Sequence, residues 1–344
     1  MIKWLRDQPL LLFVLASMAI YLPTWNYGMV SDYLGWVKKY DAGSWSDIWN
    51  CFGYAGLHQV HHFFHYTLYA MVGTNHFIYY MIFAALHGFN AFLVFRVFSA
   101  CANGLMNKPT KVAPWIACIL FLVSPYQVEA VTWKACMHYL ISMALLLWSL
   151  KSFVEWLRFH DTGKLVIHLL LWVIGMFTLE IHFATPIICM AYMLVYYRVH
   201  QERNVWSNWV VLLAIYAAFF SGYFLLNTMI IGEIVGHYGA ESHLVLSPGV
   251  IFPSAVKYLM KYGFLFHYLN YDVKHSFYQL AELPWFYMAV LGSLLLSGCL
   301  LCWSRKGKHA LLVFAGMSFF IGILPIVNLY FVDIVTYELS LIHI

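Results

Sequence analysis

Three carboxylates, Asp32, Glu129 and Glu180, each follow the end of a hydrophobic run, where a membrane-spanning helix would leave the bilayer. A carboxylate at a membrane boundary is costly unless it is paired, hydrated or used in function. Asp32 could accept a proton from a substrate hydroxyl group, and Glu129 and Glu180 could bind polar groups of a substrate. Each of the three, taken alone, also fits a solvated loop or a helix cap. Together they predict a polar chamber at one surface of a membrane.

Histidines form a second candidate site. His58, His61, His62 and His65 follow the pattern H-x-x-H-H-x-x-H, which places them on one face of a helix. Imidazoles at this spacing can bind a transition metal. We expect His61 and His62 to line a polar entrance or bind phosphate, so we assign no metal ligand, although a divalent metal is an open alternative. Membrane di-iron enzymes use several histidine boxes on the cytoplasmic side, and this sequence has one.

The composition explains which elements must position these side chains. The 344-residue chain is 63% hydrophobic and 10% charged, whereas soluble domains are about 25% charged. The sequence therefore predicts an all-α polytopic membrane protein. A spanning helix needs about 20 mostly apolar residues, and about nine candidate spans meet this, with another hydrophobic helix at 254–270. The spans are 8–27, 76–98, 112–128, 137–155, 164–180, 183–198, 206–227, 283–303 and 309–330.

The distribution of charge predicts the orientation. If these spans alternate across the bilayer, 13 of the 19 Lys and Arg residues fall on the side of the N-terminus, so that side is expected to be cytoplasmic. The three carboxylates and the histidines then lie on the external face of a membrane, which we expect to be a bacterial cytoplasmic membrane. The first external loop, 28–75, is expected to hold an interfacial helix from Ser44 through Phe52.

Several motifs, taken in order, resemble the glycosyltransferase C superfamily. The closest resemblance is to the O-mannosyltransferases that join a membrane domain to tetratricopeptide repeats, and to their bacterial relatives. The resemblance covers most of residues 20–338. It is carried by Gly73-Thr74-Asn75-His76 with His87-Gly88-Phe89-Asn90, by Ser124-Pro125 with Glu129-Ala130-Val131 and Trp133, and by Leu179-Glu180 with Pro186.

This resemblance implies transfer of a sugar from a polyprenyl-phosphate donor to a hydroxyl group of a protein or glycan acceptor, with inversion at the anomeric carbon. It implies no nucleic-acid partner. Asp32 aligns with the acidic residue that acts as the base. The other residues implied are Glu129 and Glu180, which would orient hydroxyl groups, and Lys134, His138 and His182, which would meet the departing phosphate.

The sequence departs from the family pattern at cationic positions. Met137 and Leu179 stand where an Arg and a Lys are usual, so the chain resembles either a divergent enzyme that uses histidines and Lys134 or an inactive relative. The alternative function is a non-catalytic membrane transporter or scaffold whose outer carboxylates are caps and ion-pair partners. Transporters often contain internal repeats, and we find none in this sequence. A di-iron oxidoreductase is the third possibility.

The domain organisation is expected to be a single membrane domain over residues 1–338. The last six residues, 339–344, read Leu-Ser-Leu-Ile-His-Ile. This is a literal translation of a transposon end used in DNA sequencing libraries, so we expect the natural protein to continue after Glu338.

Overall fold

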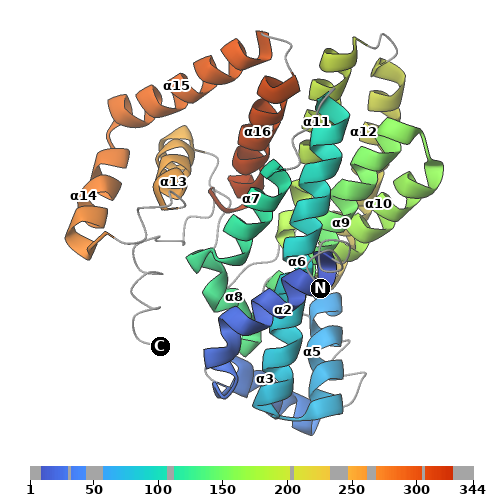
Figure 1. Ribbon diagram of the computed structural model, residues 1–344, viewed down its shortest axis with the longest axis vertical. Coiled ribbons are helices and arrows are strands. Elements are labelled where there is room, and N and C mark those ends of the chain that lie inside the picture. Colours follow the sequence, from blue (N-terminus) through green and yellow to red (C-terminus); the bar gives the residue numbers. More distant parts are fainter. Residues whose placement is uncertain are drawn as a thin grey trace. The chain divides into compact units, whose positions relative to one another are not determined.

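The computed structural model describes residues 9–29, 32–43, 57–106, 112–201, 205–232, 247–261, 269–303 and 307–327. Within these ranges every regular element is a helix (Figure 1), which confirms the predicted all-α class. The α-helices are α2 (Pro9–Tyr21), α3 (Asp32–Ala42), α5 (Gln59–Val72), α6 (His76–Leu105), α7 (Val112–Leu122), α8 (Val128–Thr132), α9 (Met137–Phe159), α10 (Thr162–Met176), α11 (Thr185–His200), α12 (Val205–Ile231), α13 (Pro248–Lys261), α14 (Tyr271–Ala281), α15 (Pro284–Trp303) and α16 (Gly307–Val327). Four 3-10 turns are η1 (Leu22–Thr24), η2 (Pro125–Gln127), η3 (Lys134–Cys136) and η4 (Glu180–Phe183).

The chain divides into two compact units. The first unit is Met1–Thr185 with Asn204–Gly236, and the second is Pro186–Arg203 with His237–Ile344. Within the second unit, α13 packs against α14, α15 and α16, and Tyr192 of α11 meets Phe314 of α16 edge to face. All the candidate site residues lie in the first unit.

The long helix α6 is the centre of the first unit. It packs against α2, α7 and α9, and α9 packs in turn against α10. Gly88 permits the close crossing with α2, because a Cβ atom there would lie 2.6 Å from the carbonyl oxygen of Phe13. The N-terminus of α6 is capped by Asn75, whose side chain accepts a hydrogen bond from the Ile78 amide at 3.2 Å. This helix therefore provides the rigid support on which the site elements are built.

Aromatic and polar contacts attach α12 to the same unit. Trp172 of α10 meets Tyr216 of α12 edge to face, with ring centroids 5.0 Å apart. Tyr216 also shares a 2.7 Å hydrogen bond with His168, and the other ring nitrogen of His168 lies 2.8 Å from the Ser149 hydroxyl oxygen of α9. This buried chain of side chains joins three helices through paired polar groups.

The number of membrane spans differs from the prediction. In the described residues three helices are long and apolar enough to cross a membrane, or up to five if two bent helix pairs each count as one span, instead of nine. One predicted span, 112–128, breaks at Pro125 with a bend of 51°, because proline disfavours helical geometry in the residue before it. The predicted span 164–180 overlaps the 15-residue helix α10, which is about 22 Å long, against a hydrocarbon core of about 30 Å.

Two other expected elements are only partly covered. The interfacial helix predicted from Ser44 through Phe52 lies outside the described residues. The helix predicted at 254–270 corresponds in part to α13, which ends at Lys261, and residues 262–268 are again outside the described ranges.

Candidate functional site

The candidate site forms where α3, α5, the start of α9 and η4 meet. α3 packs against α5 and η3, and α9 packs against both α5 and η4. The Val60 amide at the start of α5 donates a 3.2 Å hydrogen bond to the carbonyl oxygen of Phe177, just before η4. This bond ties the histidine-rich helix to the turn that carries Glu180, which follows it by more than 100 residues in the sequence.

Glu180 is paired with the first histidine of the cluster. Its Oε1 atom lies 3.1 Å from Nε2 of His58, and the two side chains are 35% and 12% exposed. Burial opposes ionisation of the carboxyl group, but the hydrogen bond and charge of His58 outweigh that effect, so the pKa of Glu180 is lowered. Glu180 is therefore a carboxylate at neutral pH with part of its surface open to solvent.

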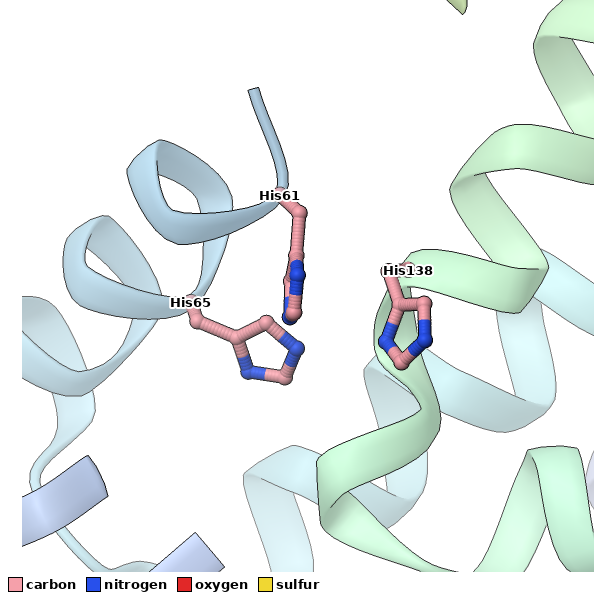
Figure 2. A group of neighbouring side chains, drawn as sticks. All are labelled: His61, His65 and His138. Atoms are coloured by element: carbon pink, nitrogen blue, oxygen red, sulfur yellow. The ribbon is translucent and has the colours of Figure 1, made fainter. Parts of the chain in front are cut away.

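Three imidazoles converge next to this pair. His61 and His65 project from α5 toward His138 at the start of α9 (Figure 2). One ligand atom from each residue can be chosen so that all three lie within 4.8 Å of one another. The ring centroids of His61 and His138 are 4.2 Å apart, and those of His61 and His65 are 4.7 Å apart. We call these three residues the histidine triad.

An aromatic side chain from α3 packs against two rings of the triad. The Trp36 ring lies edge to face against His61 and His65, with centroids 5.0 Å away in both cases. It also meets His62 at 6.0 Å, and His62 stacks on His61 at 4.8 Å with an interplanar angle of 16°. His62 is half-buried at the edge of the cluster, whereas His61 is 5% exposed and His65 is fully buried.

Burial favours the uncharged form of the α5 histidines in this cluster. Burial, followed by the neighbouring imidazoles, lowers the pKa of His61 and His65 well below the ordinary histidine value. Burial and the proximity of His58 and Lys39 lower the pKa of His62 to about 4. At neutral pH these three rings are thus uncharged, and each retains one nitrogen lone pair.

The predicted catalytic residue, Asp32, is the first residue of α3. The next residue, Tyr33, is fully buried, and its ring centroid lies 5.6 Å from that of His65. The Tyr33 and Tyr79 hydroxyl groups share a 2.5 Å hydrogen bond, which joins α3 to α6. The first turn of α3 therefore abuts the histidine cluster, while the Asp32 side chain lies outside what the structure describes.

The other predicted site residues occupy different environments. Glu129 is exposed in the first turn of α8. Lys134 is 1% exposed, and its Nζ atom lies 5.5 Å from the centre of the Phe83 ring. His182 is fully buried, with Nε2 3.1 Å from the Ser142 hydroxyl oxygen, while its carbonyl oxygen accepts a hydrogen bond from Trp172. Burial lowers the pKa of His182 to about 4.

The structure therefore gathers some of the predicted residues more clearly than others. Glu180, His61, His62 and His138 surround the start of α5, whereas Lys134 and His182 are packed into the interior. Sequence reasoning grouped His65 with the histidine pattern but did not assign it a site role, and it missed Trp36 entirely. The four-residue spacing of His61 and His65 was visible in the sequence, but no local signal placed either one against His138.

The fold and site define an all-α protein in which several helices are long and apolar enough to cross a membrane and in which a histidine- and glutamate-containing cluster forms between helices. No protein-family profile matches the sequence, and no curated protein and no solved structure matches it.

Proposed function

We propose that this chain is an integral-membrane glycosyltransferase that moves a sugar from a polyprenyl-phosphate donor to an acceptor hydroxyl group on the external face, with inversion. The observation that carries the proposal is the convergence of α3, α5, the start of α9 and η4. The sequence predicts that these four segments leave the membrane on the same side. A single site at that surface could meet a lipid-borne phosphate and a water-soluble acceptor together.

Each proposed role follows from the chemistry of its residue. Asp32 accepts the proton of the acceptor hydroxyl group as the lipid phosphate leaves. Glu180, a partly exposed carboxylate paired with His58, orients hydroxyl groups of sugar or acceptor, and the exposed Glu129 does the same from α8. His61, His62 and His138 line the approach to the phosphate.

The buried cation Lys134 has a supporting role in this scheme. Its Nζ atom has no hydrogen-bond partner among the described residues. A positive charge at that position, close to the start of α9, stabilises the negative charge that develops on the departing phosphate through the surrounding low-dielectric interior. His182 holds the η4 turn by its contacts with Ser142 and Trp172, and it thereby positions Glu180.

The experiment measures donor turnover by the full chain in liposomes that contain a radiolabelled polyprenyl-phosphate sugar and a mixture of hydroxyl-bearing acceptor peptides. We expect Asp32→Asn to abolish release of free polyprenyl phosphate without changing the yield of folded protein. Asp41→Asn is the matched control, because Asp41 lies on the same helix, where it accepts a 2.5 Å hydrogen bond from Tyr69. Wild-type turnover in Asp32→Asn would remove the assignment of the base.

Glu129→Gln and Glu180→Gln are expected to reduce turnover less completely than Asp32→Asn, because they orient the substrate and do not transfer the proton. If these two variants are instead lost during membrane insertion or purification, the carboxylates act as structural elements of their turns. That result would favour the transporter or scaffold alternative.

A further inference from the structure

The interior of the histidine triad has unpaired polar atoms. His65 is fully buried, and neither of its ring nitrogens has a hydrogen-bond partner among the residues that the structure describes. The same holds for Nε2 of His61, which is 5% exposed. Buried polar groups are nearly always satisfied, so an unpaired group of this kind indicates a binding partner such as an ion.

The third ring is already prepared to act as a ligand. Nδ1 of His138 lies 3.0 Å from the carbonyl oxygen of Ala135 and donates to it, because a carbonyl group can only accept. The proton is thereby held on Nδ1, and the lone pair is left on Nε2. A backbone carbonyl in this position is the common way in which proteins orient a metal-binding histidine.

We propose that His61, His65 and His138 bind a zinc ion. Three imidazole nitrogens with a fourth position left open are a common ligand set of zinc sites that retain an exchangeable ligand. Since the three ligand atoms lie within 4.8 Å of one another, an ion at their centre would be at most about 2.8 Å from each. Zinc–imidazole bonds are about 2.0–2.1 Å, so the rings close in by about 0.7 Å when the ion binds.

The ligand types select the class of ion. In the described part of the chain no carboxylate or thiolate joins the three imidazoles. Magnesium and calcium require oxygen ligands, which this site lacks, whereas neutral imidazole favours zinc and its neighbours in the first transition series. An anion such as phosphate would instead need positively charged or N–H donor groups from several sides.

The surroundings fit a bound cation. The Trp36 ring packs against His61 and His65 and restricts their rotation, and Glu180 is close enough for its charge to act on His138. A cation here would supply positive charge beside the proposed glycosyltransferase site. The zinc site does not depend on that function, however, because it follows from the triad alone.

The test uses the full chain purified in detergent through a tag that contains no histidine, so that no added imidazole binds metal. After removal of metal with a chelator, zinc is titrated against a competing chelator, and bound metal is measured by mass spectrometry. We expect about one tightly bound zinc ion per chain. Replacement by Co²⁺ should give the intense visible absorption of a four-coordinate site, which random surface binding does not produce.

The variants His61→Gln, His65→Gln and His138→Gln should each weaken zinc binding by at least about 100-fold, since loss of an outer-shell partner alone costs 10- to 100-fold. His275→Gln is the control, because His275 is an exposed histidine of α14 and is not part of the triad. It should retain wild-type affinity. The wild-type stoichiometry and the Co²⁺ spectrum test the site even if a variant does not fold.

Several outcomes would overturn the proposal. They are the absence of zinc binding by the wild-type chain, equal loss of binding in His275→Gln, and stoichiometric iron in place of zinc in the protein as isolated. Protection of the folded chain by inorganic phosphate, with no effect of zinc, would assign the triad to an anion instead. A zinc site without sugar transfer would disprove only the proposed function, and sugar transfer by a wild-type chain that binds no zinc would disprove only this inference.

Discussion

The close approach of the His182 ring to Gly175 of α10 allows the packing beside the site to be tested by a single substitution. A Cβ atom added at Gly175 would overlap Cγ, Nδ1 and Cε1 of the imidazole, which are ring atoms of a side chain that is fully buried. The ring cannot swing into solvent, and it is held by its contact with the Ser142 hydroxyl group. Alanine at position 175 must therefore displace His182 or separate α10 from η4.

The expected loss of stability follows from three contributions. Overpacking a dense interior costs about 1–3 kcal/mol, and weakening the hydrogen bond to Ser142 costs about 0.5–1.5 kcal/mol. The greater helix preference of alanine recovers up to about 1 kcal/mol. We therefore expect Gly175→Ala to reduce the free energy of unfolding by about 0.5–4.5 kcal/mol, equivalent to a melting temperature lower by roughly 1–18 °C.

Gly222→Ala is the matched control for this substitution. Gly222 also lies within a helix, α12, but it is exposed, and a Cβ atom there would have no neighbour within 4 Å. The same change should therefore be neutral or stabilise the chain by up to about 1 kcal/mol. Both variants are compared by heating detergent-purified protein and measuring the fraction that remains folded by size-exclusion chromatography.

The double variant Gly175→Ala/His182→Ala separates steric overlap from a general effect of the glycine. With the ring removed, the new methyl group has space, so the double variant should be at least about 0.5 kcal/mol more stable than the sum of the two single changes predicts. The reasoning is refuted if Gly175→Ala melts at or above the wild-type temperature, or if the two changes are additive.

Two further predictions concern buried and paired groups. Tyr33→Phe and Tyr79→Phe should each reduce the free energy of unfolding by about 1–3 kcal/mol, because each change leaves the other hydroxyl group buried and unpaired. In thermal unfolding experiments the double variant should lose less stability than the sum of the two single variants. Additive losses would argue against the shared hydrogen bond. Glu180 faces His58, and its charge also acts on His138. In the folded state the pKa of Glu180 is below its ordinary value of 4.5. The ionised carboxylate therefore stabilises the fold above about pH 4.5, and this contribution is lost as the pH falls through the folded-state pKa. Glu180→Gln should therefore flatten the dependence of melting temperature on pH between about 3 and 5, and an unchanged profile would show that the pairing does not affect stability.

The predicted membrane spans show where sequence patterns reach their limit. Hydropathy identified the apolar segments and the helical class, since both depend on local composition. The Ser124-Pro125 pair in the sequence predicts that a helix ends there, but hydropathy could not give the 51° angle at this break, or show that the apolar run containing α10 ends after 15 helical residues. The angle between two helices depends on their contacts with neighbouring helices, which hydropathy does not describe.

The sequence by itself determined that this protein is helical and apolar, and that His61 and His65 share a helix face, because the spacing of residues along one helix is a local property. The tertiary structure alone decided that His138, more than 70 residues away, completes the triad, that Glu180 pairs with His58, and that His182 turns inward. Those arrangements depend on which helices pack together, and that is set by the complementary shapes of side chains distant in the sequence.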